Sequence, residues 1–278
     1  MTESNNFQFS DNSVAMSYDG VLVPLMFEPW ARQLLDDYPI WHNCHILDLA
    51  TGTGIVTRLL SERIGNEGSI VGVDINGEML EIAKQRLGQD GANITFTESE
   101  AHCLNLPSNS VDVVVCQQGF QFFPDRSVAA KEIHRVLVPN GKTIISTWLP
   151  VSEYHVFGVI CESLIFIGEN EIAGLMRIPF DFINRGELIN HFQATGFVNI
   201  SVSERKMPFK IPGGIDQAIK VAYSTPIGPK LRSLPNKIQE LFKKEMAVRL
   251  TNLTSDGVTM GQMVSNILEA EKVSAISS

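Results

Sequence analysis

The chain has 278 residues, of which 44% are hydrophobic, so it holds enough apolar side chains for one large core or two smaller ones. Its 22 Lys and Arg against 31 Asp and Glu give a formal net charge of -9, and because the basic residues form no run we expect no nucleic acid partner. The sequence contains neither an apolar stretch of about 18 residues nor a signal-peptide pattern, so we expect a cytoplasmic protein that does not insert into a membrane.

The chain has four cysteines, and no two of them form a CxxC pair. This spacing predicts neither a disulfide framework nor a zinc knuckle. His42, Cys44 and His45 are residues of the metal-ligating kind, but adjacent side chains of the strand expected there point to opposite faces. Since a structural zinc site takes about four convergent ligands, we expect no metal.

Short apolar runs alternate with segments of helical periodicity through the first half of the chain. The runs that predict strands are 45–50, 69–74, 93–99, 111–117 and 142–148, and the periodic segments that predict helices are 55–64, 79–87 and 126–137. Strands alternating with amphipathic helices predict an α/β fold with a Rossmann-like, doubly wound and mostly parallel sheet, because right-handed crossovers place helices on both faces. We expect this core to span residues 45–150.

The remainder, 151–278, is less regular, and we expect it to form a helical cap with a substrate region and the last strands of the sheet. Residues 155–168 are apolar nearly throughout, which predicts a buried helix or a helix that lines an apolar pocket. Residues 198–211 have strand-like composition with a break at Pro208. The other predicted elements are a helix and turn over 185–197, a helix over 236–250 and a returning strand over 258–268.

The segment 48–54, which ends the first predicted strand and forms the turn after it, carries an acid and three small residues, namely Asp48, Ala50, Gly52 and Gly54. It lies at the carboxyl end of that strand, where open α/β sheets bind their ligands. Small residues let the backbone bend sharply and approach a ligand closely. Asp74 closes the second strand, 20 residues after Gly54, where its carboxylate can accept hydrogen bonds from two ribose hydroxyls. The pattern predicts an adenosine-containing ligand.

A nicotinamide dehydrogenase has a similar turn, G-x-G-x-x-G, with an acid about 20 residues further on. Here Thr57 stands where the third glycine belongs. Asp48 would repel a pyrophosphate, whereas it would attract an ammonium or a sulfonium. No tyrosine is followed by a lysine four residues later, so the short-chain hydride-transfer pair is missing. An NAD-dependent oxidoreductase is therefore the less favoured alternative.

Four segments resemble, in order and spacing, the motifs of the ubiquinone/menaquinone-biosynthesis-type methyltransferases: LDLATGTG, VGVDIN, SEAHCLNLPSNSVDVVVCQQGFQFFPD and EIHRVLVPNGKTIISTW. The resemblance covers residues 45 to 148. It implies the class I methyltransferase fold with S-adenosyl-L-methionine as cofactor and S-adenosyl-L-homocysteine as product.

The resemblance also implies roles for single residues near the methionine and ribose parts of that cofactor. The turn from Ala50 to Gly54, with Thr51 in it, would wrap the methionine part. Asp74 would hold the ribose. Gln117, taken as the first position after the fourth strand, would contact the methionine amino group.

A second group of residues is implied for the adenine. Ile75 and Met79 would flank its ring, and Glu100 with Ala101 would contact its edge.

The segment SYDG in the N-terminal region resembles a part of relatives in which a tyrosine covers the cofactor. Tyr18 would take this role, which makes residues 1–44 an N-terminal helical lid.

Methyl transfer is an in-line displacement on a sulfonium, so the enzyme chiefly holds the acceptor atom near the methyl carbon and excludes water. An acceptor that carries a proton also needs a general base. His155, just past the fifth predicted strand, is the candidate base, and Gln118 is a candidate for orienting the acceptor. The alternative reading is a helix-end histidine on the surface and a polar loop glutamine.

The acceptor class follows from weaker signals. CQQGF stands where base and amide nitrogen methyltransferases carry an Asn/Asp-Pro-Pro-aromatic signature. The apolar segments 155–168 and 175–183 predict a hydrophobic acceptor cavity. We therefore expect methylation of a small, largely apolar molecule, such as a secondary metabolite, quinone or lipid-like compound, at O, N or C. The alternative is a protein of this fold that binds the cofactor without methyl transfer, as a cyclase, isomerase or sensor.

Overall fold

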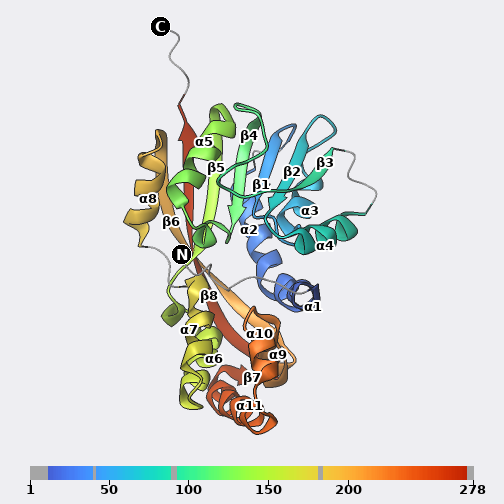
Figure 1. Ribbon diagram of the computed structural model, residues 1–278, viewed down its shortest axis with the longest axis vertical. Helices are drawn as coiled ribbons and strands as arrows, with labels where there is room; N and C mark the ends of the chain where they lie inside the picture. Colours follow the sequence, from blue (N-terminus) through green and yellow to red (C-terminus); the bar gives the residue numbers. More distant parts are fainter. Residues whose placement is uncertain (1–11, 40–41, 89–92, 181–183, 274–278) are drawn as a thin grey trace. The chain divides into compact units, whose positions relative to one another are not determined.

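The computed structural model describes residues 12–39, 42–88, 93–180 and 184–273, and Figure 1 traces them. They form two compact units. Unit 1 holds the described residues within Met1–Phe27, Leu149–Phe182 and Lys206–Val264; unit 2 holds those within Glu28–Trp148, Ile183–Arg205 and Ser265–Ser278. The predicted division into 1–44, 45–150 and 151–278 stays a prediction.

The sheet, most of which belongs to unit 2, has the strand order β3-β2-β1-β4-β5-β8-β6, and β7, which belongs to unit 1, pairs with β8. The strands are β1 (His45–Leu49), β2 (Ser69–Asp74), β3 (Ile94–Glu98), β4 (Val111–Gln117), β5 (Leu137–Trp148), β6 (Phe197–Pro212), β7 (Thr254–Ser255) and β8 (Val258–Lys272). From β3 to β5 all neighbours are parallel, and β8 runs antiparallel to β5. The predicted Rossmann-like, mostly parallel sheet is confirmed.

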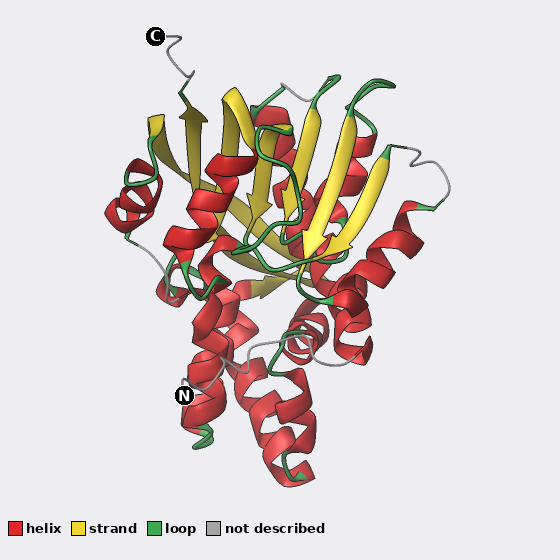
Figure 2. Cartoon of the chain, turned by 45° about the horizontal axis from the view of Figure 1, so that its top comes forward, coloured by secondary structure: helices red, strands yellow, loops and turns green. Residues whose placement is uncertain are grey.

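The central strands are apolar at successive positions because both of their faces are covered. In β1, Ile46 and Leu47 are both buried, and in β4, Val114 and Val115 are both buried. Helices of unit 2 lie on the two faces of the sheet (Figure 2). They are α2 (Glu28–Asp37), α3 (Ile55–Ser61), α4 (Gly77–Leu87), α5 (Arg126–Val136) and α8 (Arg185–Gln193), with a short 3₁₀ turn at Phe120–Phe122.

Local signals set the ends of these helices. The Asn76 side chain accepts hydrogen bonds from the backbone N–H groups of Glu78 and Met79, which caps the start of α4. Gly88, with φ of 71°, ends the same helix in a backbone conformation that suits glycine.

The fifth strand begins at Leu137 rather than at 142, because Leu137 already pairs with Val111 before a register shift.

Unit 1 is mainly helical. Its helices are α1 (Asn12–Ser17), a π-helical segment (Tyr18–Phe27), α6 (His155–Phe166), α7 (Asn170–Arg177), α9 (Gly214–Ser224), α10 (Gly228–Ser233) and α11 (Asn236–Leu250), with short 3₁₀ turns at Val151–Glu153, Ile178–Phe180 and Thr251–Leu253. The core of this unit is aromatic. The Tyr154 and Phe180 ring centroids lie 4.7 Å apart, and Phe157 stacks on Phe209 at 5.9 Å. The predicted buried helix over 155–168 is thus found as α6.

The predicted break at Pro208 is wrong, since β6 continues through this residue to Pro212. The reason is the place of β6 at the end of the strand order. An edge strand tolerates proline because the missing N–H can face solvent instead of a neighbouring strand. Pro208 is accordingly exposed.

In the described part of the chain, no helix is both long and apolar enough to cross a bilayer.

Candidate functional site

The turn after β1 doubles back in left-handed backbone conformations. Ala50, Gly52 and Gly54 have φ of 58°, 56° and 79°. A Cβ atom added at Gly52 would meet nothing within 4 Å, so this side of the turn is open. Such a turn at the carboxyl end of a strand offers backbone groups to a ligand without a side chain in the way.

Two glycines make room for other parts of the protein rather than for a ligand. A Cβ at Gly54 would lie 2.9 Å from the Cβ of Ala83, so Gly54 lets the turn pack against α4. A Cβ at Gly119, just past β4, would overlap the Cβ of Ala50 and lie 3.0 Å from the sulfur of Cys116. Ala50 therefore fits only because residue 119 is glycine.

Asp48 is buried below the turn, with 1% of its surface exposed. Its Oδ2 accepts hydrogen bonds from Thr51 Oγ1 at 2.6 Å, Thr57 Oγ1 at 2.7 Å and the Thr57 backbone N–H at 3.0 Å. Burial raises the pKa of this carboxyl to about 6, although the threonine hydrogen bonds act in the opposite direction. The carboxylate thus joins the turn to the first residues of α3.

Thr57 is a functional residue whose role the sequence reasoning missed. There it served only as evidence against a third glycine. In the structure it is fully buried and gives Asp48 two of its hydrogen bonds. A hydroxyl residue nine positions after a buried acid was the available signal.

Asp74 ends β2 and joins two turns. Its Oδ2 accepts a hydrogen bond from Gly52 N at 2.8 Å, and its Oδ1 accepts one from Asn76 N at 2.9 Å. Burial raises its pKa. The backbone N–H of Ile75 also donates to this carboxyl group, so three of its four acceptor positions are taken and one remains for a ribose hydroxyl. The geometry brings together the acid and the glycine turn that the sequence singled out, and it fits a ribose.

The residues expected around the adenine come from the segments after β2 and β3. Ile75 is 59% exposed, an unusual state for a large apolar side chain, whereas Met79 in the first turn of α4 is buried. Ala101 is buried, and the side chain of Glu100 is 65% exposed. This set combines an apolar surface with a polar edge, which suits a planar base, and the assigned contacts stay predictions.

Gln117 is the last residue of β4, so Gln118, rather than Gln117, is the first residue past the strand. Gln118 is 4% exposed and has φ of 58°, a strained conformation for a residue with a side chain. Its Nε2 donates to Ser265 Oγ at 2.9 Å, and that hydroxyl donates to Thr147 O at 2.9 Å.

The serine fixes the orientation of the Gln118 amide. Its single proton goes to a backbone carbonyl, that of Thr147 at 2.9 Å or that of Asn266 at 3.2 Å, so the group of Gln118 that faces it is the donor, Nε2. The opposite atom, Oε1, is buried and has no hydrogen-bond partner among the described residues. A buried acceptor without a partner is rare in folded proteins and calls for a ligand donor or a water.

The remaining candidates, Tyr18 and His155, belong to unit 1. The Tyr18 ring lies 4.9 Å from that of Phe27, and its covering role stays a prediction. His155 is the exposed first residue of α6, as the helix-end reading expects.

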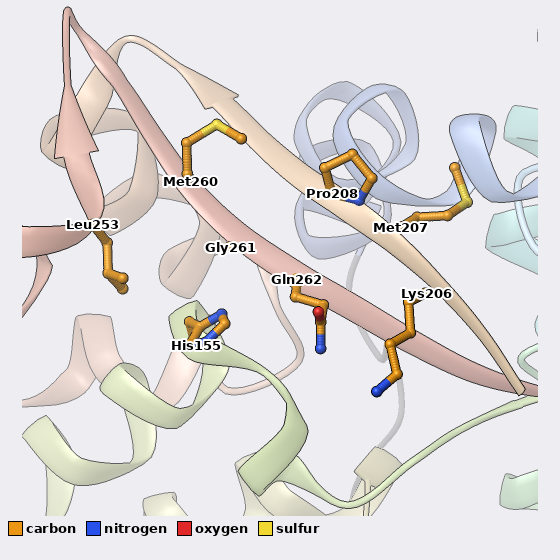
Figure 3. Close-up of a pocket in the computed structure, with 8 residues that line it drawn as sticks. All are labelled: His155, Lys206, Met207, Pro208, Leu253, Met260, Gly261 and Gln262. Atoms are coloured by element: carbon orange, nitrogen blue, oxygen red, sulfur yellow. The ribbon is translucent and has the colours of Figure 1, made fainter.

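His155 also lines a pocket of about 410 Å³ within unit 1. The other lining residues are Lys206, Met207, Pro208, Leu253, Met260, Gly261 and Gln262. Figure 3 shows the His155 imidazole and the Gln262 amide extending to the same side of the β8 ribbon. Among the described residues of the two apolar segments expected to form the cavity, His155 alone lines this pocket. Most apolar residues of α6 pack into the core, and Ile165 and Phe166 are exposed. Residues 181–183 lie outside the described residues.

Comparison with known proteins gives the following matches. A family described as a methyltransferase domain matches residues 46–141. The chain is 30% identical over 175 residues to the ubiquinone/menaquinone biosynthesis C-methyltransferase UbiE of Legionella pneumophila, covering 58% of this chain and 70% of that protein. It is 29% identical over 203 residues to the demethylmenaquinone methyltransferase of Staphylococcus aureus, covering 68% and 84%.

A solved structure with a similar fold is the phosphoethanolamine N-methyltransferase 2 of Haemonchus contortus in complex with S-adenosyl-L-methionine. The TM-score is 0.63 at 16% identity, covering 99% of this chain and 61% of that one.

Proposed function

The chain belongs to the class I S-adenosylmethionine-dependent methyltransferases, and from this premise we propose that it methylates a small, largely apolar molecule. When bound, S-adenosylmethionine supplies an electrophilic methyl group on a sulfonium. One observation carries the cofactor-binding part of the proposal. Gly52 N donates a hydrogen bond to Asp74 Oδ2 beside the open face of the turn. It supports a site in which the turn holds the methionine part and Asp74 holds the ribose.

Gln118 orients the acceptor in this proposal. Its buried Oε1 accepts a hydrogen bond from an O–H or N–H of the acceptor, while Ser265 keeps the amide from rotating. Support comes from two independent features, the strained backbone at Gln118 and the unpaired buried oxygen, because strain of this kind gathers at functional sites.

Unit 1, taken by itself, holds a pocket whose lining suits an apolar ligand. Met207, Pro208, Leu253 and Met260 supply an apolar lining, and binding pockets for small ligands are mostly apolar with a few polar groups. His155 takes the proton when the acceptor atom carries one. The names of the two curated relatives place them in quinone biosynthesis, which favours a quinone-like acceptor among the lipid-like and secondary-metabolite candidates.

The test is transfer of label from methyl-labelled S-adenosylmethionine. The full chain is incubated with a cell extract and, separately, with a short-chain demethylated hydroquinone, and the organic phase is examined for labelled product. We expect label in an apolar small molecule, and Gln118→Leu should lower the rate while S-adenosylhomocysteine affinity is retained. Tight S-adenosylhomocysteine binding without labelled product would favour the binding-only alternative. Preference for NAD in calorimetry would instead favour the dehydrogenase.

A further inference from the structure

The segment between β3 and β4, residues 99–110, has no regular secondary structure, yet it carries two of the residues assigned to the adenine, Glu100 and Ala101. Its first residue is anchored to the ribose side of the site, since Ser99 N donates to Asp74 O at 3.0 Å. An irregular segment of this kind holds a fixed shape only when its backbone groups find partners elsewhere.

Two side chains of α5 provide those partners. Glu132 Oε2 accepts a hydrogen bond from Leu104 N at 2.8 Å, and Arg135 Nη2 donates to Leu104 O at 2.9 Å. Arg135 Nη1 also donates to Leu106 O at 2.7 Å. Both backbone polar groups of Leu104 are thus satisfied by side chains of one helix, and the Leu104 side chain is buried.

Glu132 and Arg135 are also paired with each other. Arg135 Nε lies 2.7 Å from Glu132 Oε1 and Nη2 lies 2.8 Å from Oε2, the two-pronged geometry that a guanidinium allows and an ammonium does not. The arginine hydrogen bond and the Leu104 N–H lower the pKa of the Glu132 carboxyl, so it remains an ionised acceptor at neutral pH. Its side chain is only 16% exposed, which limits screening by solvent.

A further contact lies next to Ala101. His102 Nε2 accepts a hydrogen bond from Asp125 N at 3.1 Å, and the Asp125 side chain caps the start of α5 by accepting from Val128 N. The segment is therefore attached to α5 near both ends of this helix.

We propose that Glu132 and Arg135 are positioning residues for adenine recognition. They hold residues 100–106 in the conformation that contacts the edge of the adenine, and neither Glu132 nor Arg135 contacts the adenine itself. The inference rests on the proposed adenine role of Glu100 and Ala101. Without the pair, the segment must be ordered when the cofactor binds, and the ordering entropy weakens affinity. The loss of affinity comes from weaker recognition of the adenine, and binding of the methionine part is unchanged.

The experiment uses the full chain and two ligands, S-adenosylhomocysteine and S-inosylhomocysteine, in which hypoxanthine replaces adenine. Dissociation constants are measured by calorimetry for the wild type, Arg135→Lys and Glu132→Gln, at a temperature where near-ultraviolet circular dichroism shows each to be folded. The control is Glu240→Gln, which breaks an ion pair of the same i,i+3 spacing with Lys243 in unit 1. Hydrogen exchange at the Leu104 amide reports the order of the segment directly.

Both test variants should bind S-adenosylhomocysteine about tenfold more weakly, the effect of losing one charge-assisted hydrogen bond. Their preference for adenine over hypoxanthine should shrink, Leu104 exchange should accelerate, and Glu240→Gln should match the wild type. Equal weakening of both ligands, or faster exchange with unchanged affinity, would overturn the inference. A wild type that binds neither ligand would instead overturn the cofactor assignment.

Discussion

The contact between Ala50 and Gly119 allows a quantitative test of the site geometry. Gly119 has φ of -103°, so replacing it with alanine introduces no backbone strain, and the whole effect comes from the new Cβ. That atom would overlap the Cβ of Ala50 and crowd the sulfur of Cys116. Overpacking of this kind destabilises by about 1 to 3 kcal/mol. Gly119→Ala should therefore lower the free energy of unfolding and displace the turn.

The matching change, Ala50→Gly, acts in the opposite direction. Left-handed backbone at Ala50 costs roughly 1 to 2 kcal/mol, which glycine relieves. The greater freedom of glycine in the unfolded chain removes about 0.4 to 1 kcal/mol of that gain. Ala50→Gly alone should thus be neutral or slightly stabilising.

The double variant Ala50→Gly/Gly119→Ala tests the contact directly, because it again places a single Cβ atom between positions 50 and 119. Urea unfolding of the wild type, both single variants and the double variant gives a coupling energy, which we expect to be about 1 to 3 kcal/mol in favour of the double variant. S-adenosylhomocysteine affinity, lost in Gly119→Ala, should return in part. A coupling below about 0.5 kcal/mol, the usual limit of additivity, would refute the proposed contact.

Three further predictions concern the same site. Gly52→Ala should lower stability by about 1 to 2 kcal/mol through backbone strain, and it should lower the free energy of S-adenosylhomocysteine binding by more, because the new methyl group enters the open face of the turn. Urea unfolding measures the first loss and calorimetry the second. Equal losses would count against a ligand at this face of the turn. Asp74→Ala should weaken S-adenosylhomocysteine binding about tenfold to a hundredfold through loss of hydrogen bonds to an ionised acceptor, and undiminished binding in calorimetry would exclude the ribose role. Burial raises the pKa of Asp48 to about 6 from about 3.9 in an unfolded chain, so this group stabilises the native state at low pH and loses that contribution as pH rises from about 4 to about 6. Relative to Asp48→Asn, the wild type should lose roughly 3 kcal/mol across this range in urea unfolding, and parallel pH profiles would disprove it.

Much of the α/β core could be predicted because the sequence patterns that define its strands and helices are local. The apolar run of β4 and the Asn76 and Gly88 caps of α4 each lie within a few residues of the element that they define. The start of β5 was missed for the opposite reason. Leu137 joins a strand only because Val111 lies beside it, and such pairing is not visible in the periodicity of either segment.

The candidate site divides in the same way. Asp48 and Asp74 could be found because acids at strand ends beside a glycine turn form a recognisable pattern. The attachment of Leu104 to Glu132 was not predictable, since a carboxylate 28 residues away supplies the partner of a backbone N–H. The same holds for Ser265, which orients Gln118 across an even longer stretch of chain.

The strands β6 and β8 each have residues in both units, and β8 pairs along β5 from Lys142 to Trp148. A fragment that ends at Trp148 would contain the whole matched methyltransferase domain but would leave β5 as an uncovered edge of the sheet. Uncovered edges pair with other chains, so such a fragment should aggregate rather than fold. During synthesis, the cofactor-binding unit likewise stays incomplete until the residues of β8 have left the ribosome, although all residues assigned to the cofactor precede them.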